Sequence, residues 1–267
     1  MPGSNGRMGS PPLLSIDDVV VRFAGITAVR DASKQYVQTG LFGIIGPNGA
    51  GKTTLLGVIS GLVRPSSGDV RINGRAISEV PDHKVASLGI ARSFQTPRLM
   101  GPETVLTNIL VGRHRLVRAG LASQVLDLRR YRAEEAEHTS AAVQLALELG
   151  FNRADLQRRA DSLPFGVRRL VEVARSLVSQ PQIVLLDEPA AGLSRQERID
   201  LSSFLVSHAQ AHDVLVILTE HDVDLVRRIC EEVLVMDSGS VIADGAPATV
   251  LELEPVRRAY FGDAINA

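Results

Sequence analysis

The chain contains the octapeptide Gly46-Pro47-Asn48-Gly49-Ala50-Gly51-Lys52-Thr53, which fits the pattern G-x-x-x-x-G-K-[ST] at every fixed position. An apolar segment, Leu41–Ile45, precedes it, and a helical pattern follows it to about Ser60. Glycines let the backbone curl so that successive N–H groups point inward at an anion, and the helix start adds its positive dipole end. The pattern therefore predicts a phosphate-binding loop between a buried strand and a helix.

The last two residues of this loop have specific chemistry. Lys52 can reach the β- and γ-phosphates of a nucleotide, and the Thr53 hydroxyl can ligate Mg²⁺. Only three residues of the chain are lysine, and one of them stands here. A glycine-rich turn that happens to hold a lysine is the competing interpretation, but the strand and the helix on either side are predicted independently. A nucleoside triphosphate with Mg²⁺ is the ligand that the loop predicts.

Composition limits the class of protein. The chain has 267 residues, a net charge of -1, 45% hydrophobic and 22% charged residues, which predicts a folded globular protein and argues against a strongly basic nucleic-acid binder. No segment supplies the ~20 apolar residues of a membrane-spanning helix. Residues 1–12 lack the apolar centre of a secretory signal, so we expect a disordered leader and a cytoplasmic protein. The single cysteine, Cys230, is expected to be a buried apolar residue in a helix.

Strand patterns lie at both ends of the chain and helical spacing lies between them. From about Thr96 to Gln180 apolar residues recur at helical intervals, and one helix is expected to end at Gly150. A further helix is expected over Arg168–Val178. We therefore predict an α/β domain whose later strands form a parallel sheet and which contains a helical insert. The expected strands, besides Leu41–Ile45, are Leu14–Phe23, Tyr36–Val37, Asp69–Ile72, Ile183–Leu186, Val214–Leu218 and Val233–Met236.

Two acids and one histidine follow predicted parallel strands. Asp187 and Glu188 come directly after Ile183–Leu186, and His221 follows Val214–Leu218. Open α/β sheets place their ligand chemistry at the carboxyl ends of the strands. There Asp187 would hold Mg²⁺ through water, Glu188 would polarise the attacking water as a general base, and His221 would meet the γ-phosphate. A solvated acid pair is the alternative, and the other five histidines are expected to be structural.

Several further motifs resemble those of ABC-transporter ATPases. The resemblance covers the chain from about Leu13 onward and rests on five motifs: Gln95 resembles the Q-loop, 161–167 stands in the place of the signature loop, 190–194 resembles the D-loop, His221 resembles the switch histidine, and Phe23 takes the place of the aromatic that stacks on adenine.

The resemblance implies a P-loop NTPase (RecA-like) fold with a parallel-sheet core, an N-terminal antiparallel β part and an inserted helical subdomain. It divides the chain into a core of residues 13–95 and 181–246, an insert of 96–180 and a C-terminal helical stretch of 247–267. It also implies ATP and Mg²⁺ as cofactors. The site residues that it implies are Glu188, His221 and Gln95 for catalysis, Thr53, Gln95 and Asp187 for the metal, and Phe23, Gly46, Pro47, Asn48, Gly49, Ala50, Gly51, Lys52, Thr53, Thr54, Leu163 and Gly166 for the nucleotide.

In detail the chain is most similar to the ATP-binding subunits of branched-chain amino acid importers, through 91–95, the long insert, 189–193 and 258–262. This resemblance implies membrane permease subunits, a second ATPase subunit in a homo- or heterodimer, an indirect solute-binding protein and no nucleic acid. The chain would then be peripheral on the inner face of the cell membrane. A related urea or amide importer is one alternative, because the solute is chosen by other chains. A soluble non-transport ABC ATPase is a second alternative.

The signature loop departs from the family pattern, which reads Leu-Ser-Gly-Gly-Gln or Leu-Ser-Tyr-Gly-Gln. Pro164 replaces the serine and Val167 replaces the glutamine. The family's serine gives a hydroxyl to the γ-phosphate on the opposite subunit, whereas proline offers neither a hydroxyl nor an N–H. Gly166 and the helix start remain as an anion site. One lost hydrogen bond to a charged oxygen is worth roughly 1.5–3 kcal/mol, so we expect weakened dimer closure, and a poorly hydrolysing regulatory subunit is the alternative.

Overall fold

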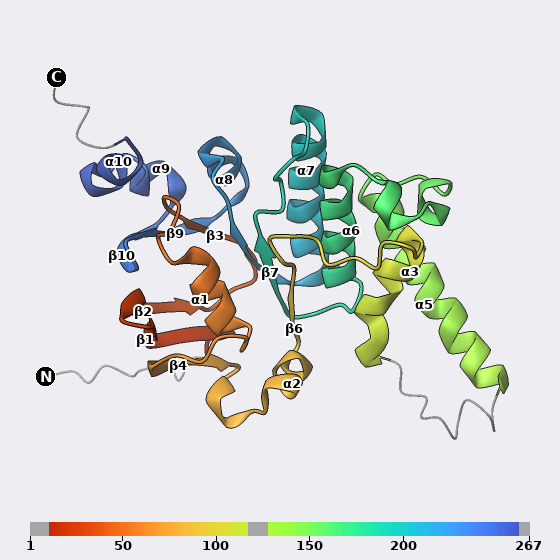
Figure 1. Cartoon of the computed structure of the whole chain (residues 1–267), viewed down its shortest axis with the longest axis horizontal. Helices are drawn as coiled ribbons and strands as arrows, with labels where there is room; N and C mark the ends of the chain where they lie inside the picture. The colour runs from red at the N-terminus through yellow and green to blue at the C-terminus, as the bar shows by residue number, and fades with distance from the viewer. Residues whose placement is uncertain (1–10, 117–127, 262–267) are drawn as a thin grey trace, which may run out of the picture.

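The computed structural model describes residues 11–116 and 128–261, so the expected leader lies outside the described residues except for Pro11 and Pro12. The described strands form one ten-stranded mixed sheet in the order β5-β4-β1-β2-β10-β9-β3-β8-β7-β6. Helices cover this sheet, and a helical region extends from its β6–β7 edge (Figure 1). The predicted α/β fold, with a parallel core, an antiparallel N-terminal part and a helical insert, is confirmed.

The N-terminal part of the sheet is antiparallel. β1 has the predicted bounds, but the strand expected at Tyr36–Val37 is wrong in length, because β2 begins ten residues earlier at Ile26. Ala24 and Gly25 both have positive φ angles and form the turn between the two strands. Asp31, also at positive φ, lies where the pairing of β2 with β1 shifts register, which breaks the alternation by which a strand is recognised. The four strands are β1 (Leu14–Phe23), β2 (Ile26–Tyr36), β4 (Ser67–Ile72) and β5 (Arg75–Ala76).

The other part of the sheet is parallel. β3 pairs with β8 and β9, and β7 pairs with β6 and β8, all in parallel register. Every residue of β3, β7 and β8 is buried, as expected of strands covered on both faces. These strands are β3 (Gly40–Ile45), β6 (Ile90–Arg92), β7 (Ile183–Asp187), β8 (Leu215–Thr219) and β9 (Glu232–Asp237).

One more strand joins the two parts. β10 (Ser240–Gly245) runs antiparallel to β9 and touches β2 through the pair Ser240–Arg30. Neither β10 nor the three-residue β6 was predicted. The sequence of β10 is only partly apolar and its residues are half-buried or exposed, so it lacks the continuous apolar pattern of the inner strands.

Two hydrophobic clusters sandwich the parallel strands. Ile183 and Leu185 of β7 face the cluster that contains α1 (Lys52–Ile59), whereas Val184 and Leu186 face the opposite cluster. The opposite cluster contains α6 (Phe165–Leu177), α7 (Arg195–His212) and α8 (Val223–Ile229). This double burial fixes the ends of the parallel strands, where the candidate site lies.

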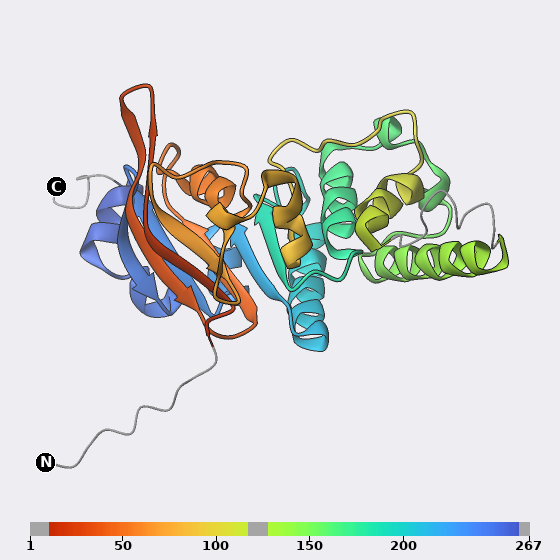
Figure 2. The same ribbon diagram turned by 90° about the horizontal axis from the view of Figure 1, so that it is seen from below.

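The described elements between β6 and β7 are helical. The helix expected to end at Gly150 is the last part of α5, and residues 117–127 of the insert lie outside the described residues. In Figure 2 α3 and α5 lie at the end of the molecule opposite the β1–β2 hairpin. The domain bounds themselves stay a prediction. The remaining elements up to this point are η1 (Ile77–Glu79), α2 (Asp82–Val85), η2 (Ala86–Leu88), α3 (Val105–Leu110), η3 (Val111–Leu116), α5 (Leu128–Glu148), η4 (Asp155–Gln157) and η5 (Ala160–Ser162).

Three helix predictions need correction. The helix expected over Arg168–Val178 begins earlier, at Phe165, because Pro164 has the extended conformation of an N-cap. Cys230 is buried as expected, but it follows α8 in an extended conformation and does not lie within the helix. The C-terminal helical stretch is divided into α9 (Pro247–Val250) and α10 (Glu254–Phe261).

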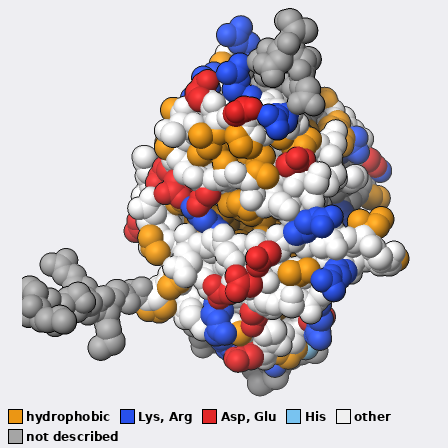
Figure 3. Space-filling view, turned by 90° about the vertical axis from the view of Figure 1, so that its left-hand side faces the viewer, with side chains coloured by type: hydrophobic (Ala, Val, Ile, Leu, Met, Phe, Trp, Pro, Cys, Tyr) orange, Lys and Arg blue, Asp and Glu red, His pale blue; other side chains and the backbone are white. Residues whose placement is uncertain are grey.

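On the face shown in Figure 3 acidic and basic side chains alternate, and neither sign dominates. Among the described residues, no helix is both long enough and apolar enough to span a lipid bilayer.

Candidate functional site

The predicted phosphate-binding loop connects β3 to α1, as expected. Gly51 stands at the N-cap of α1 with a φ of 100°, and a Cβ atom there would overlap the carbonyl oxygen of Ala28. Only glycine fits this position, because it combines a left-handed conformation with a close backbone approach. Asn48, Gly49 and Thr53 are exposed at the mouth of the loop. The N–H groups at the start of α1 therefore face an accessible anion site.

The side chain of Lys52 folds back over the phosphate-binding loop. Its Nζ donates hydrogen bonds to the carbonyl oxygens of Gly46, at 2.7 Å, and Pro47, at 2.9 Å. Burial lowers the pKa of Lys52, and the charges of Glu188 and Asp187 oppose that effect. A buried cation is thus held at the phosphate-binding loop by two main-chain oxygens.

Asp187 ends β7 beside the start of α1. Its Oδ1 accepts hydrogen bonds from the hydroxyls of Thr219, at 2.8 Å, and Thr53, at 3.3 Å. Its main-chain N–H donates to Oγ of Ser93 at 3.1 Å. A hydroxyl oxygen and a carboxylate oxygen side by side are the hard donors that Mg²⁺ prefers. The residues present therefore fit the metal that the sequence predicts.

Glu188 joins two other predicted residues that lie far from it in the sequence. Its Oε1 is 3.0 Å from Nε2 of His221 and 3.3 Å from Nε2 of Gln95. Glu188 has a φ of 50°, and its N–H donates to the carbonyl and to the hydroxyl of Thr219, both at 3.1 Å. A glutamate in the left-handed region costs free energy, and such residues cluster at functional sites. The structure thus brings four separate segments of the chain to one place: the phosphate-binding loop, the segment with Gln95, the end of β7 and the end of β8.

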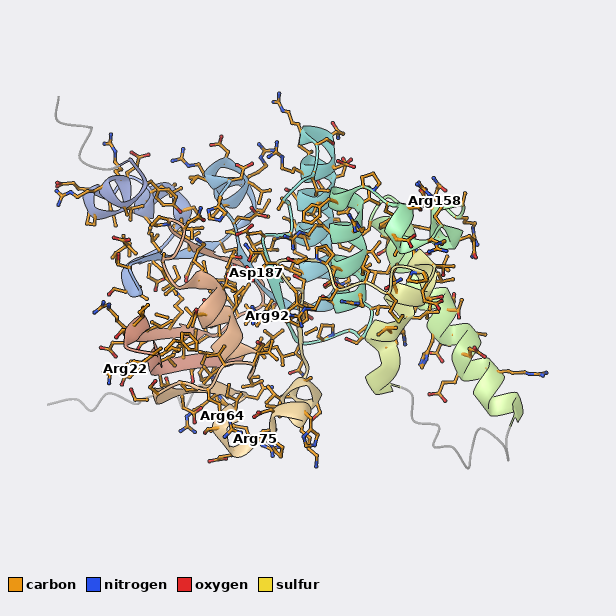
Figure 4. The ribbon with its side chains drawn as sticks, viewed as in Figure 1. Arg22, Arg64, Arg75, Arg92, Arg158 and Asp187 are labelled. Atoms are coloured by element: carbon orange, nitrogen blue, oxygen red, sulfur yellow. The ribbon has the colours of Figure 1, made fainter. Side chains whose placement is uncertain are left out.

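The charged residues at this site that were not predicted include Arg92, Glu220 and Arg169, whose Nη1 donates to the carbonyl oxygen of Asp187 at 3.2 Å. Arg92, in β6, places Nη2 3.5 Å from Oδ2 of Asp187 (Figure 4). Glu220 is buried, and its Oε1 accepts a hydrogen bond from the N–H of Ala190 at 2.8 Å. Burial raises the pKa of Glu220 to about 7. In the sequence, Arg92 stands shortly before Gln95 and Glu220 stands directly before His221. These positions do not indicate which groups lie near the two side chains in the fold.

Phe23, Leu163 and Gly166 lie outside this cluster. Phe23 is 50% exposed at the end of β1, and its neighbour Arg22 lies on the outer strands away from Asp187 (Figure 4). The side chain of Leu163 is buried in the hydrophobic core, so any nucleotide contact there would come from its main chain. Gly166 lies in the first turn of α6, where a Cβ would press against the carbonyl of Gly192. Thr54, Pro47 and Ala50 belong to the loop and the start of α1.

The phosphate-binding loop between β3 and α1, with acids at the carboxyl ends of adjacent parallel strands, defines a P-loop nucleoside triphosphatase. The sequence profile of a family described as ABC transporter matches residues 29–191. The chain therefore belongs to the ABC transporter family and is one of its ATPase cassettes.

Relatives and solved structures agree with this assignment. The chain is 34% identical to the high-affinity branched-chain amino acid transport ATP-binding protein LivG of Salmonella typhimurium, over 96% of this chain and 100% of the relative. The identity and coverage are the same for BraF of Pseudomonas aeruginosa, a protein with the same description. A crystal structure of a nucleotide-free ATP-binding cassette from an ABC transporter matches 94% of this chain and 100% of its own, with a TM-score of 0.80 and 28% identity.

Proposed function

We propose that the chain is the ATP-hydrolysing subunit of an importer for branched-chain amino acids. The observation that carries this proposal is the 34% identity to LivG over the full length of that relative. The related urea or amide importers remain the alternative within the same class. A soluble ABC ATPase acting on nucleic acid is less favoured, since the net charge is only -1 and the face in Figure 3 carries both signs.

In the proposed mechanism the loop from Gly46 to Thr53 binds the phosphates of ATP through its N–H groups. The Lys52 ammonium exchanges its bonds with Gly46 and Pro47 for the β- and γ-phosphate oxygens, which are stronger acceptors because they are charged. Thr53, Asp187 and Gln95 would hold Mg²⁺, which neutralises charge that develops on the phosphates.

Glu188 is proposed as the general base. Its carboxylate accepts a proton from the attacking water as that water approaches the γ-phosphate. The hydrogen-bonding contacts of Glu188 with His221 and Gln95 fix the orientation of the carboxylate. His221 would also contact the γ-phosphate. Gln95 lies in the segment that follows β6, and through its contact with Glu188 it would connect that segment to the site.

We further propose that two cassettes close head to tail on ATP. The start of α6 at Gly166, with the main chain of Leu163, would cover the γ-phosphate bound by the other subunit. Phe23 would stack on adenine. Pro164 leaves α6 without a side-chain cap and contributes no hydroxyl to this contact, so closure is weaker than with serine. The partner is a second copy or a related cassette.

The remaining partners follow from the proposed role. Membrane permease subunits would dock near Gln95 and the helical insert, which places this chain on the inner face of the cell membrane as a peripheral subunit. A solute-binding protein would act through the permease.

The test is reconstitution of the chain with the membrane permease subunits that co-purify with it. We expect ATP hydrolysis and uptake of labelled leucine that both depend on the cognate binding protein, and neither activity with Glu188→Gln. Uptake of urea or short amides in place of leucine would move the chain to the alternative importer. Salt-dependent DNA affinity in about the micromolar range, without stimulation by any permease, would contradict a transport role.

A further inference from the structure

A buried arginine lies against the proposed metal ligand. Nη2 of Arg92 is 3.5 Å from Oδ2 of Asp187, and the two side chains are 10% and 1% exposed. Figure 4 shows Arg92, at the end of β6, near Asp187, at the end of β7. Because water is largely excluded from both side chains, their charges are screened much less than those of a surface pair. The guanidinium therefore offsets much of the negative charge of Asp187.

Arg92 has anchors of its own. Its Nη1 donates to Oγ of Ser60 at 3.0 Å, and its Nη2 donates to the carbonyl of Thr53 at 3.4 Å. Its guanidinium lies 5.8 Å from the centre of the Phe94 ring. Thr53 belongs to α1, and Ser60 is the C-cap of that helix. The positive charge of Arg92 is therefore fixed at the helix that carries the proposed metal-binding hydroxyl of Thr53.

Asp187 is positioned by other residues. Thr219 binds its Oδ1 at 2.8 Å, and its N–H is bound to Ser93. Arg92 contacts the other carboxylate oxygen, Oδ2. Removing the guanidinium would leave the hydrogen bonds that hold Asp187 in place, and it would change mainly the charge at the site.

We propose that Arg92 is an internal counter-ion that lowers the affinity of the Asp187 site for Mg²⁺. This inference rests on the proposed function, because it takes Thr53 and Asp187 as metal ligands. A divalent cation approaching Asp187 meets the fixed positive charge of Arg92 as well as the carboxylate. The affinity for the metal is therefore weaker than the oxygen ligands alone would give.

The position of Arg92 also connects this effect to Gln95. Arg92 is the last residue of β6, and among the described strands β6 pairs only with β7. The segment with Phe94 and Gln95 follows at once. Arg92 is therefore held on the same short strand that leads into Gln95.

Direct binding of Mn²⁺, followed by electron paramagnetic resonance with a saturating non-hydrolysable ATP analogue, tests the proposal. We expect Arg92→Gln to bind Mn²⁺ roughly tenfold more tightly than the wild type, since it loses a nearby buried charge. Arg92→Lys keeps the charge and is expected to stay within about threefold of the wild type. Arg64→Gln is the matched control, because Arg64 pairs with Asp82 at an exposed site. Competition by Mg²⁺ should follow the same order.

The outcomes separate the two proposals. If the wild type shows no nucleotide-dependent Mn²⁺ binding, or if Asp187→Asn binds as well as the wild type, the proposed metal site is wrong. If the wild type binds Mn²⁺ and Asp187→Asn does not, but Arg92→Gln binds equally or more weakly, the counter-ion role is overturned and the metal site stands.

A second measurement covers the case in which Arg92→Gln does not fold. The guanidinium ¹⁵N resonance of Arg92 can be assigned by its loss in Arg92→Lys. It should shift when Mg²⁺ is added to the wild type bound to the analogue. Binding of the analogue in the presence of EDTA should shift it less. A resonance that does not respond to Mg²⁺ would contradict the proposal.

Discussion

Nε2 of His221 lies 3.0 Å from Oε1 of Glu188, although 33 positions of the chain separate them. The two residues follow β8 and β7, whose ends are aligned by the parallel pairing of Thr219 with Asp187. The contact therefore results from the register of the sheet, and it holds the proposed general base in one orientation.

Replacing Glu188 by Gln should separate nucleotide binding from hydrolysis. The amide keeps the shape of the side chain but accepts no proton from water, and removal of such a group typically slows a reaction by about 10²–10⁴-fold. We expect unchanged ATP binding, strongly reduced turnover and dimers that persist with ATP in analytical ultracentrifugation. The exposed Glu79→Gln serves as control. Normal turnover by Glu188→Gln would refute the assignment of the base.

Replacing Pro164 by Ser should raise turnover with the cognate permease. The hydroxyl would restore one bond to a charged phosphate oxygen, worth roughly tenfold or more in dimer closure. It would also cap α6, which adds about 1 kcal/mol of stability. Pro164→Ala, which lacks the hydroxyl, should leave turnover unchanged. If Pro164→Ser and the wild type hydrolyse ATP at the same rate, the account of the signature loop is wrong.

Glu220 should make folding stability depend on pH. Burial raises its pKa in the folded state to about 7, from 4.5. A group with a raised folded pKa stabilises most below the unfolded pKa, and this contribution is lost as the pH rises through the folded pKa. Relative to Glu220→Gln, the wild type should therefore lose up to about 3 kcal/mol between pH 4.5 and 7. Urea unfolding at several pH values measures this difference, and parallel curves for the two proteins would contradict it.

His208 should have the opposite effect. Burial and the charge of nearby His212 lower its pKa from 6.5 to about 4. Its contribution to stability is present above pH 6.5 and is lost as the pH falls toward 4, because the unfolded chain takes up a proton first. The free energy of unfolding relative to His208→Asn should fall by up to about 3 kcal/mol over this window. The exposed His83→Asn is the control, and an equal trend in both variants would disprove the effect of burial.

The sequence predicted the core of the candidate site because its geometry is local or follows from strand ends. The loop that ends at Lys52 is one continuous segment, and Asp187, Glu188 and His221 follow apolar strands whose parallel pairing brings their ends together. Arg92 and Glu220 were missed because the groups that give them importance, Asp187 and Ala190, are distant in the sequence.

The parts of the fold that were missed have weak or interrupted patterns. The positive φ of Asp31 breaks the alternation in β2, and β10 has a partly apolar sequence with no fully buried residue. The early start of α6 depends on the extended conformation of Pro164, which the periodicity of the following residues does not indicate. Each of these features is set by backbone geometry or by a neighbouring strand.

The central claim is that the main-chain amides around Lys52 bind the triphosphate of a nucleotide. Calorimetric titration of the purified chain with ATP, with Mg²⁺ and then with EDTA, tests it most directly. We expect saturable binding that is strengthened by Mg²⁺ and abolished in Lys52→Ala. Absence of any magnesium-dependent affinity for ATP in the wild type would contradict the account.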